Sequence, residues 1–298
     1  MKGGSCMKFL PVLLLSAFVY AQNPKIPRMA DGHPDLRGFW NNASLTPLER
    51  PVALGDKQVF STEEAAAFER SRLQEVNRDR RDGGTQADAA RAYNEAWFDR
   101  GTKVSKLSRT SLVVDPPNGR VPALLPEAKA KWDKIQADFA AHPGDGPEDR
   151  PLPDRCLLFS QVGPPMLPGN YNDNYHIVQT PTSIAIRTEM GDITRVIPVV
   201  NQRNANQSNA TRPHLPASVR QWTGDPRGHW EGDTLVVEST NFRVGPRSRF
   251  GVQLDAMTDE NLRIVERFTR TNADTIVYRA TVEDPTVFSK PWTVEIAM

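Results

Sequence analysis

The sequence contains little cysteine, and its cysteines do not pair within the mature chain that we expect. Cys6 falls in an N-terminal segment that we expect to be removed, which leaves Cys156 alone. An odd cysteine in an oxidising compartment requires either a partner outside the sequence or an unpaired thiol. We interpret Cys156, which follows Arg155, more simply as half of a missing disulfide than as a nucleophile.

Signatures of several enzyme and nucleotide-binding classes are also absent. There is no Gly-x-Ser-x-Gly sequence, which excludes the nucleophile elbow of an α/β-hydrolase. There is neither a Gly-Lys-Ser/Thr phosphate loop nor a dinucleotide fingerprint. The sequence therefore indicates no cofactor, and it leaves open whether the protein is an enzyme.

The sequence has no excess of charge of either sign. Its 37 basic residues are balanced by 36 acidic ones. Nucleic acids and anionic membranes usually require a strongly basic face on the proteins that bind them. We therefore expect neither as a partner, and the oligomeric state is not indicated.

Long hydrophobic runs are missing, apart from a short one at the N-terminus. The apolar run 9–19 is about half the ~20 residues that span a bilayer, and Lys2 and Lys8 precede it. Small residues precede a cleavage site after Ala21, and no cysteine follows for a lipid anchor. This predicts a signal peptide over residues 1–21 and a periplasmic or secreted protein without membrane insertion.

The first half of the mature chain is rich in proline. Most of the 25 prolines lie before residue 220, which predicts ordered loops there. Ser61 and Glu64 form a capping-box pattern that predicts the start of a helix. Short strands are expected at 36–40 and 111–114, further helices over 86–98 and 126–141, and a linker over 142–153. We predict an N-terminal loop and helical region at 22–150 and a β-domain at 151–298.

From Tyr175 onward, apolar and polar residues alternate with the period of β-strands. The predicted strands are 175–179, 183–190, 193–199, 227–231, 234–241, 261–270, 274–284 and 290–296. Gly-Asp pairs between them are typical of tight hairpin turns. We predict a mainly β fold, α+β overall, in which an antiparallel meander of about eight strands forms an up-and-down barrel or a curled sheet. The Asn/Gln-rich stretch 200–222 is either a lid or disordered.

Several motifs together resemble one recurrent family of exported bacterial proteins to which we can attach no function. They lie at residues 31–36 with Trp40, 45–51, 110–120, 155–156, 163–166, 177–181, 227–237, 265–268, and 284–285 with 291–293. Members of that family continue past this chain's last residues into a Cys-His-Glu-Gly-Asn segment, and the resemblance implies a partner there for Cys156. More distantly, Gly38-Phe39-Trp40 is similar to the Gly-x-Trp start of lipocalin-like barrels.

Two charged residues interrupt apolar faces of predicted strands. Arg195 alternates with isoleucines and valine along 193–199, and Glu266 alternates with apolar residues along 262–268. Burying either charge alone would cost several kcal/mol, so two inward-facing charges should pair. The pair is either an internal salt bridge or a polar anchor for a ligand, unless the faces are solvated.

The remaining candidate site residues are polar or aromatic. Glu238 is a third charge on an apolar face, and Tyr175 and His176 belong to the aromatic and amide cluster 171–176. Such clusters line carbohydrate and aromatic-ligand sites, although amide-rich turns are also common without a function. Trp222 completes the predicted ligand-binding set.

A metal site is not predicted. His229, Glu231 and Asp233 stand at alternating positions, which on a strand would place three possible ligands on one side. Gly232 and Asp233 are more simply the hairpin turn itself, where the alternation ends.

We therefore expect an exported soluble protein that binds a small amphipathic, aromatic or saccharide molecule in a pocket of the β-domain. One alternative is an enzyme, a hydrolase or lyase, in which a buried carboxylate (Glu266 or Glu238) works with His176. A second alternative is a structural or interaction protein of the cell envelope.

Overall fold

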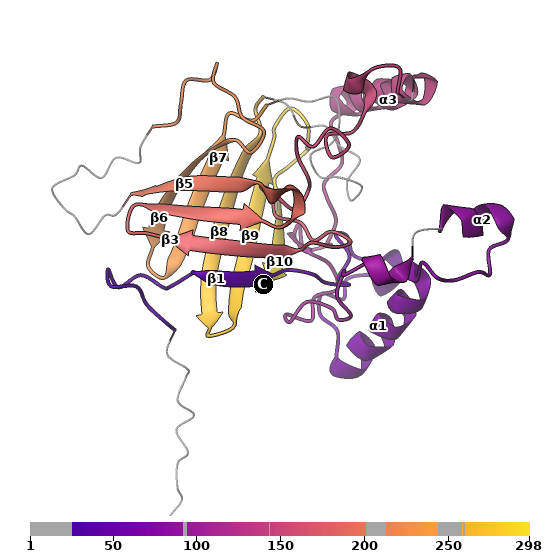
Figure 1. The fold of residues 1–298 in the computed structure, drawn as a ribbon, viewed down its shortest axis with the longest axis horizontal. Helices are drawn as coiled ribbons and strands as arrows, with labels where there is room; N and C mark the ends of the chain where they lie inside the picture. The colour runs from indigo at the N-terminus through magenta and orange to yellow at the C-terminus, as the bar shows by residue number, and fades with distance from the viewer. Residues whose placement is uncertain (1–25, 92–93, 143, 201–212, 244–257, 259) are drawn as a thin grey trace, which may run out of the picture.

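The computed structural model describes residues 26–91, 94–142, 144–200, 213–243, 258 and 260–298, and these contain one ten-stranded sheet that curls into an open half-barrel (Figure 1). The strands are β1 (Gly38–Asn41), β2 (Val113–Asp115), β3 (Asn174–Gln179), β4 (Ser183–Thr188), β5 (Thr194–Val200), β6 (Asp225–Glu231), β7 (Thr234–Thr240), β8 (Arg263–Asn272), β9 (Thr275–Glu283) and β10 (Trp292–Ala297). Their order in the sheet is β1-β3-β4-β5-β6-β7-β8-β9-β10-β2.

The predicted mainly β fold is confirmed, with the curled sheet rather than the closed barrel as its form. Strands β3 to β10 match the eight predicted strands, and the two-residue alternation that buries one face is clearest in β3, β8 and β9. The sheet is mixed, since β5 and β6 pair in parallel. The long connection between Val200 and Asp225 allows this, because a parallel neighbour needs a return of a dozen or more residues.

Both edges of the sheet come from the first half of the chain. β1 pairs with β3, and β2 pairs with β10, in both cases antiparallel. The domain boundary predicted near residue 150 remains a prediction. The prediction that 200–222 is either a lid or disordered concerns mainly residues 201–212, which lie outside the described residues.

The helices lie to one side of the sheet, at the right in Figure 1. They are α1 (Thr62–Val76), α2 (Thr85–Ala90) and α3 (Pro126–Ala141), with short 3-10 turns at Val52–Leu54, Glu95–Trp97, Pro147–Asp149 and Met190–Asp192. The capping box of Ser61 and Glu64 is present at the start of α1, as predicted.

The helix predicted over 86–98 is wrong in extent, because α2 covers six residues and only a 3-10 turn follows it. α2 has no buried residue, and so short a helix is marginal without packing. No helix in the described ranges has both the length and the apolar character needed to cross a bilayer.

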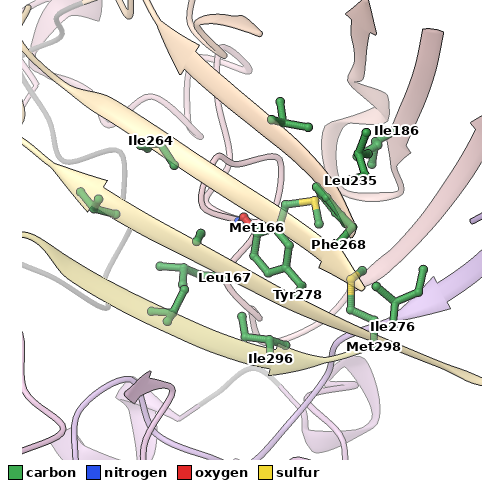
Figure 2. Packing of buried hydrophobic residues seen from close by; sticks show 14 of the residues in the cluster. Met166, Leu167, Ile186, Leu235, Ile264, Phe268, Ile276, Tyr278, Ile296 and Met298 are labelled. Carbon is green, nitrogen blue, oxygen red and sulfur yellow. The ribbon is translucent and has the colours of Figure 1, made fainter. Parts of the chain in front are cut away.

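The segment around Met166 and Leu167 fills the concave side of the sheet. Both side chains are fully buried and point toward β8, β9 and β10, beside Tyr278 and Phe268 (Figure 2). Burying a side chain of this size contributes about 1.5–3 kcal/mol. We call residues 161–167 the plug, because they occupy the space in which a barrel-like sheet would otherwise hold a ligand.

Candidate functional site

Arg195 and Glu266 form an ion pair inside the curled sheet. Arg195 Nη1 donates to Glu266 Oε1 at 3.0 Å, and Nη2 donates to Oε2. β6 and β7 separate their strands, so the pair bridges the concave face rather than two neighbouring strands. Burial alone would lower the pKa of Arg195, but the adjacent Glu266 carboxylate outweighs it and raises the pKa. The predicted inward-facing pair is confirmed.

Hydrogen bonds from this pair and its neighbours hold the plug. The Tyr278 hydroxyl donates to Glu266 Oε1 at 2.9 Å and accepts from the backbone N–H of Met166 at 2.9 Å. On the other side, the Tyr175 hydroxyl donates to the carbonyl of Gln161 at 2.9 Å. Burial raises the pKa of both tyrosines well above the ordinary range. These groups are fully buried and fix the plug.

Glu238 lies on the opposite, outer face of the sheet, in a network of charged side chains. His214 Nε2 is 3.2 Å from Glu238 Oε1, and His214 Nδ1 is 3.0 Å from Asp225 Oδ2. Arg263 binds Glu238 through Nε at 3.0 Å. Partial burial raises the pKa of Glu238, but the hydrogen bonds from Arg263 and His214 exceed that effect and lower it.

The other predicted site residues lie elsewhere. His176 stacks on Phe39 with ring centroids 4.4 Å apart, at β1 and β3. Trp222 packs beside Leu158 and Val162, with the Arg243 guanidinium 5.1 Å from its ring centroid.

The six predicted residues therefore do not form one site. Arg195, Glu266 and Tyr175 are buried inside the sheet, and Glu238 takes part in the outer network. Three strands separate the strand of His176 from that of Glu238, and His176 alternates with the inward-facing Tyr175 and Ile177. The acid–base pairing of His176 with either glutamate does not occur in this structure.

Among the described residues, no three or more His, Cys, Asp or Glu side chains are arranged to hold a metal ion. His229 Nε2 lies 3.2 Å from Glu231 Oε1, and Asp233 in the turn binds Arg28 instead. The alternation of possible ligands thus ends at the hairpin, as the sequence indicated.

An open cleft of about 760 Å³ lies outside the sheet, between the first-half loops and the segment that enters β3. We call it the arginine cleft, because four arginines line it: Arg72, Arg78, Arg91 and Arg100. The rest of its wall is formed by residues 44–49, 75–77, Phe98, Pro153, 159–161, 168–171 and Met190, among which Glu49 and Glu75 are acidic. Its volume is within the usual range for small-molecule sites.

Phe98 is the centre of an aromatic and cationic cluster in this cleft. The guanidinium carbons of Arg100 and Arg78 lie 4.3 and 5.3 Å from the centroid of its ring. Tyr171 meets the same ring edge-on, with centroids 6.1 Å apart. Arg100 also pairs with Glu95 at 2.7 Å, which fixes its position beside the ring.

The arginines of the cleft differ in whether they pair with a carboxylate. Arg72 pairs with Glu75, and Arg91 pairs with Asp82 and Asp88. Within the described part of the chain, the Arg78 guanidinium contacts the ring of Phe98 but pairs with no carboxylate. Arg78 is therefore the cation of this cleft that is best placed to bind an anion.

A buried carboxyl lies behind the rim of the cleft. Gly169, which lines the cleft, donates its backbone N–H to Asp173 Oδ1 at 2.8 Å. Burial raises the pKa of Asp173 to about 7, and the nearby Asp99 and Glu189 add to the effect. The backbone at the rim of the cleft is therefore hydrogen-bonded to a carboxyl group, that of Asp173, whose pKa is close to neutral pH.

Sequence reasoning identified this cleft only in part. Tyr171 belongs to the predicted aromatic and amide cluster 171–176, but Tyr175 and His176 of that cluster do not line the cleft. Arg78 begins the charge-dense stretch 78–82 that follows α1, and such a pattern by itself indicates only the fraying end of a helix. The contact of Phe98 with Arg78 and Arg100 depends on how the irregular segment between α1 and residue 100 folds back, which no local pattern reveals.

In comparisons with known proteins, no family model, curated protein or solved structure matches the chain.

Proposed function

We propose that the protein binds a small molecule in the arginine cleft, and that this ligand carries a ring and an acidic group. The proposal rests on the Phe98 cluster, in which one aromatic ring lies against two guanidinium groups and the edge of Tyr171. Aromatic side chains bind the flat faces of rings, and guanidinium groups bind carboxylates through paired hydrogen bonds. Aromatic carboxylates and acidic saccharides have both features.

The cleft is a better candidate than the interior of the sheet. A lipocalin-like protein would bind its ligand in the concave space, where this protein has the plug and a paired Arg195 and Glu266. Displacing the plug would expose fully buried apolar side chains and break the hydrogen bond from Met166 to Tyr278. The arginine cleft is already open and needs no such change.

We also propose that the chain is exported and that cleavage after Ala21 precedes its function. Residues 1–21 lie outside the described residues, so the proposal rests on their charge and apolar pattern alone. N-terminal sequencing of protein recovered outside the cytoplasm should begin at Gln22. A retained apolar run would contradict it.

Calorimetric titration tests the proposed ligand class. Mass spectrometry of small molecules that co-purify with the protein selects the first ligands, and 2-naphthoate and a galacturonate trisaccharide serve as fixed probes. Arg78→Ala should weaken binding of an acidic ligand by about tenfold or more, since a charge-assisted hydrogen bond contributes about 1.5–3 kcal/mol.

Arg187→Ala is the matched control, because this exposed arginine pairs with Asp192 between β4 and β5, and it does not line the cleft. It should leave the affinity unchanged. Equal affinity in Arg78→Ala and the wild type, or preference for neutral analogues, would contradict the proposed ligand class.

A further inference from the structure

A second cleft lies between β1, which is one edge of the curled sheet, and the ends of β8 and β10. It has a volume of about 630 Å³, and we call it the seam cleft. Residues 37–41 with β1 line one side, and Ala297, Met298 and the turn between β8 and β9 line the other. In Figure 1 the C-terminus, marked C, lies beside β1. Residues 102–106 form the remaining wall.

β1 directs unpaired backbone groups toward this cleft. Asn42 N–H donates to the carbonyl of Asp173 at 3.2 Å, which places Asn42 at a hydrogen-bonded position of the ladder with β3. Such positions alternate along an antiparallel pair, so Trp40 also bonds to β3. Phe39 and Asn41 therefore direct their N–H and C=O groups away from β3, to a side on which no strand of the described residues pairs with β1.

The end of β10, on the opposite side of the cleft, also directs backbone groups away from the strand it pairs with, β9. Met298 and Ile276 exchange two backbone hydrogen bonds, of 2.9 and 3.3 Å, so the preceding Ala297 points its backbone groups away from β9. On that side of β10, Glu295 N–H donates to the carbonyl of Leu112 at 2.8 Å. No backbone partner for Ala297 on that side is present in the described ranges.

Cations outnumber carboxylates around the seam cleft. Arg37 pairs with Asp35, and Lys103 pairs with Glu69. Lys106 instead donates to the carbonyl of Asp274 at 3.1 Å, and its ammonium group stays exposed at the rim.

Arg270 adds a further positive charge to the wall. It donates to the carbonyls of Asp35, Asn272 and Ala273, and its guanidinium carbon lies 5.1 Å from the centroid of the Trp40 ring. With Asp274 as the acidic residue of the lining, the cleft carries more positive than negative charge.

We propose that an extended, acidic segment of a partner protein binds in the seam cleft as an added strand. Its backbone pairs with the outward N–H and C=O groups of Phe39 and Asn41, and its acidic side chains lie near Lys106 and Arg270. Strand addition to an exposed sheet edge gives affinity through main-chain hydrogen bonds and specificity through alternate side chains. Phe39 is 79% exposed beside this edge, and it offers an apolar contact to the incoming strand.

The test uses the full mature chain and a displayed library of random peptides of about 12 residues, long enough for one strand and its flanks. Selected peptides should be enriched in Asp and Glu relative to the input library. Fluorescence anisotropy then measures the affinity of the strongest peptide. Lys106→Ala should weaken it by several-fold.

Phe39→Pro and Phe39→Ala separate the backbone from the side chain. Proline removes the N–H that faces the cleft, and it is tolerated where a strand's N–H faces away from its neighbour. Phe39→Pro should weaken the peptide by about tenfold, the expected effect of losing a main-chain hydrogen bond of about 1.4 kcal/mol. Phe39→Ala keeps the N–H and should weaken it less.

Should Phe39→Pro fail to fold, as judged by circular dichroism, peptides N-methylated at alternate residues against the wild-type protein provide the same comparison. One of the two methylation registers should lose binding. Failure to select any acidic peptide, or affinity unaffected by both backbone changes, would overturn the proposal. Dimerisation of the wild-type chain through β1, abolished by Phe39→Pro in sedimentation experiments, would also overturn it, because the occupant would be a second copy.

Discussion

The Arg195 guanidinium and the Glu266 carboxylate face each other across the inside of the curled sheet, with side chains that are 1% and 0% exposed. The two residues are on strands that are not neighbours, so their contact links β5 to β8 through the core. Tyr278 extends the link to the backbone of the plug. This chain of polar contacts fixes the plug against the sheet.

Removing one member of the pair should be costly. Glu266→Ala leaves the Arg195 guanidinium buried without a counter-ion, so we expect a loss of about 3–5 kcal/mol in the free energy of unfolding. Replacing both residues, as in Arg195→Met with Glu266→Leu, should cost less than either single change. Urea unfolding followed by circular dichroism measures all three variants.

An exposed pair provides the control for this experiment. Arg187→Ala breaks its ion pair with Asp192, in which the two side chains are 59% and 68% exposed. Exposed pairs contribute about 0–1 kcal/mol, so this variant should be close to the wild type. A loss in Glu266→Ala as small as that in Arg187→Ala would show that water reaches the interior pair.

Asp173 should make stability depend on pH. Its pKa is raised from 3.8 to about 7 in the folded protein, so between these values the folded state binds more protons than the unfolded state. The free energy of unfolding therefore falls as the pH rises from about 4 to 7, by at most about 1.4 kcal/mol per pH unit for this group. Asp173→Asn should flatten this slope when urea unfolding is measured at several pH values. An unchanged slope would mean that Asp173 is ionised in the folded state.

The β-domain was predictable because its alternation is local. Each strand from β3 to β10 carries a two-residue pattern, and the Glu231–Thr234 hairpin has Gly232 with φ of 58° at the turn. The parallel contact of β5 with β6 was not predictable, because it depends on which strands meet after a long connection. The edge strands β1 and β2 lie where short strands are predicted, at 36–40 and 111–114, but nothing in these segments indicates that they form the two edges of the sheet.

The sites were less predictable than the fold. The inward direction of Arg195 and Glu266 followed from apolar neighbours along each strand. Their meeting depends on the curl of the sheet, and the arginine cleft depends on loops whose partners are far apart in sequence. His214 follows Pro213, a pattern that indicates only a structural or solvated loop residue, because nothing local shows that Asp225 lies beside it.

The thiol of Cys156 should react in the native protein. Cys156 is exposed and unpaired in the structure. In the chain from residue 22 onward, Ellman's reagent should titrate one thiol without denaturant, and Cys156→Ser should remove that signal without loss of stability. A thiol that reacts only after unfolding would contradict the exposed position. If a longer chain supplies a partner cysteine, as the family resemblance implies, the signal should disappear on oxidation.

His214 should anchor the loop before β6 mainly through its contact with Asp225. The Asp225 side chain is 3% exposed, whereas the Glu238 side chain is 36% exposed, so the loss of the hydrogen bond to Asp225 costs more. The side-chain amide of Asn at position 214 can donate to Asp225 in place of Nδ1, and that of Gln can donate to Glu238 in place of Nε2. We expect His214→Ala to lose about 1–3 kcal/mol in the free energy of unfolding.

His214→Asn should then recover more of this loss than His214→Gln. Hydrogen exchange of the Leu215 amide gives a local measure of the same contact, because this N–H donates to Asp225 Oδ2 at 2.8 Å. Its exchange should accelerate in His214→Ala and stay slow in His214→Asn. If His214→Gln protects this amide as well as His214→Asn does, then Glu238, and not Asp225, holds the histidine in place.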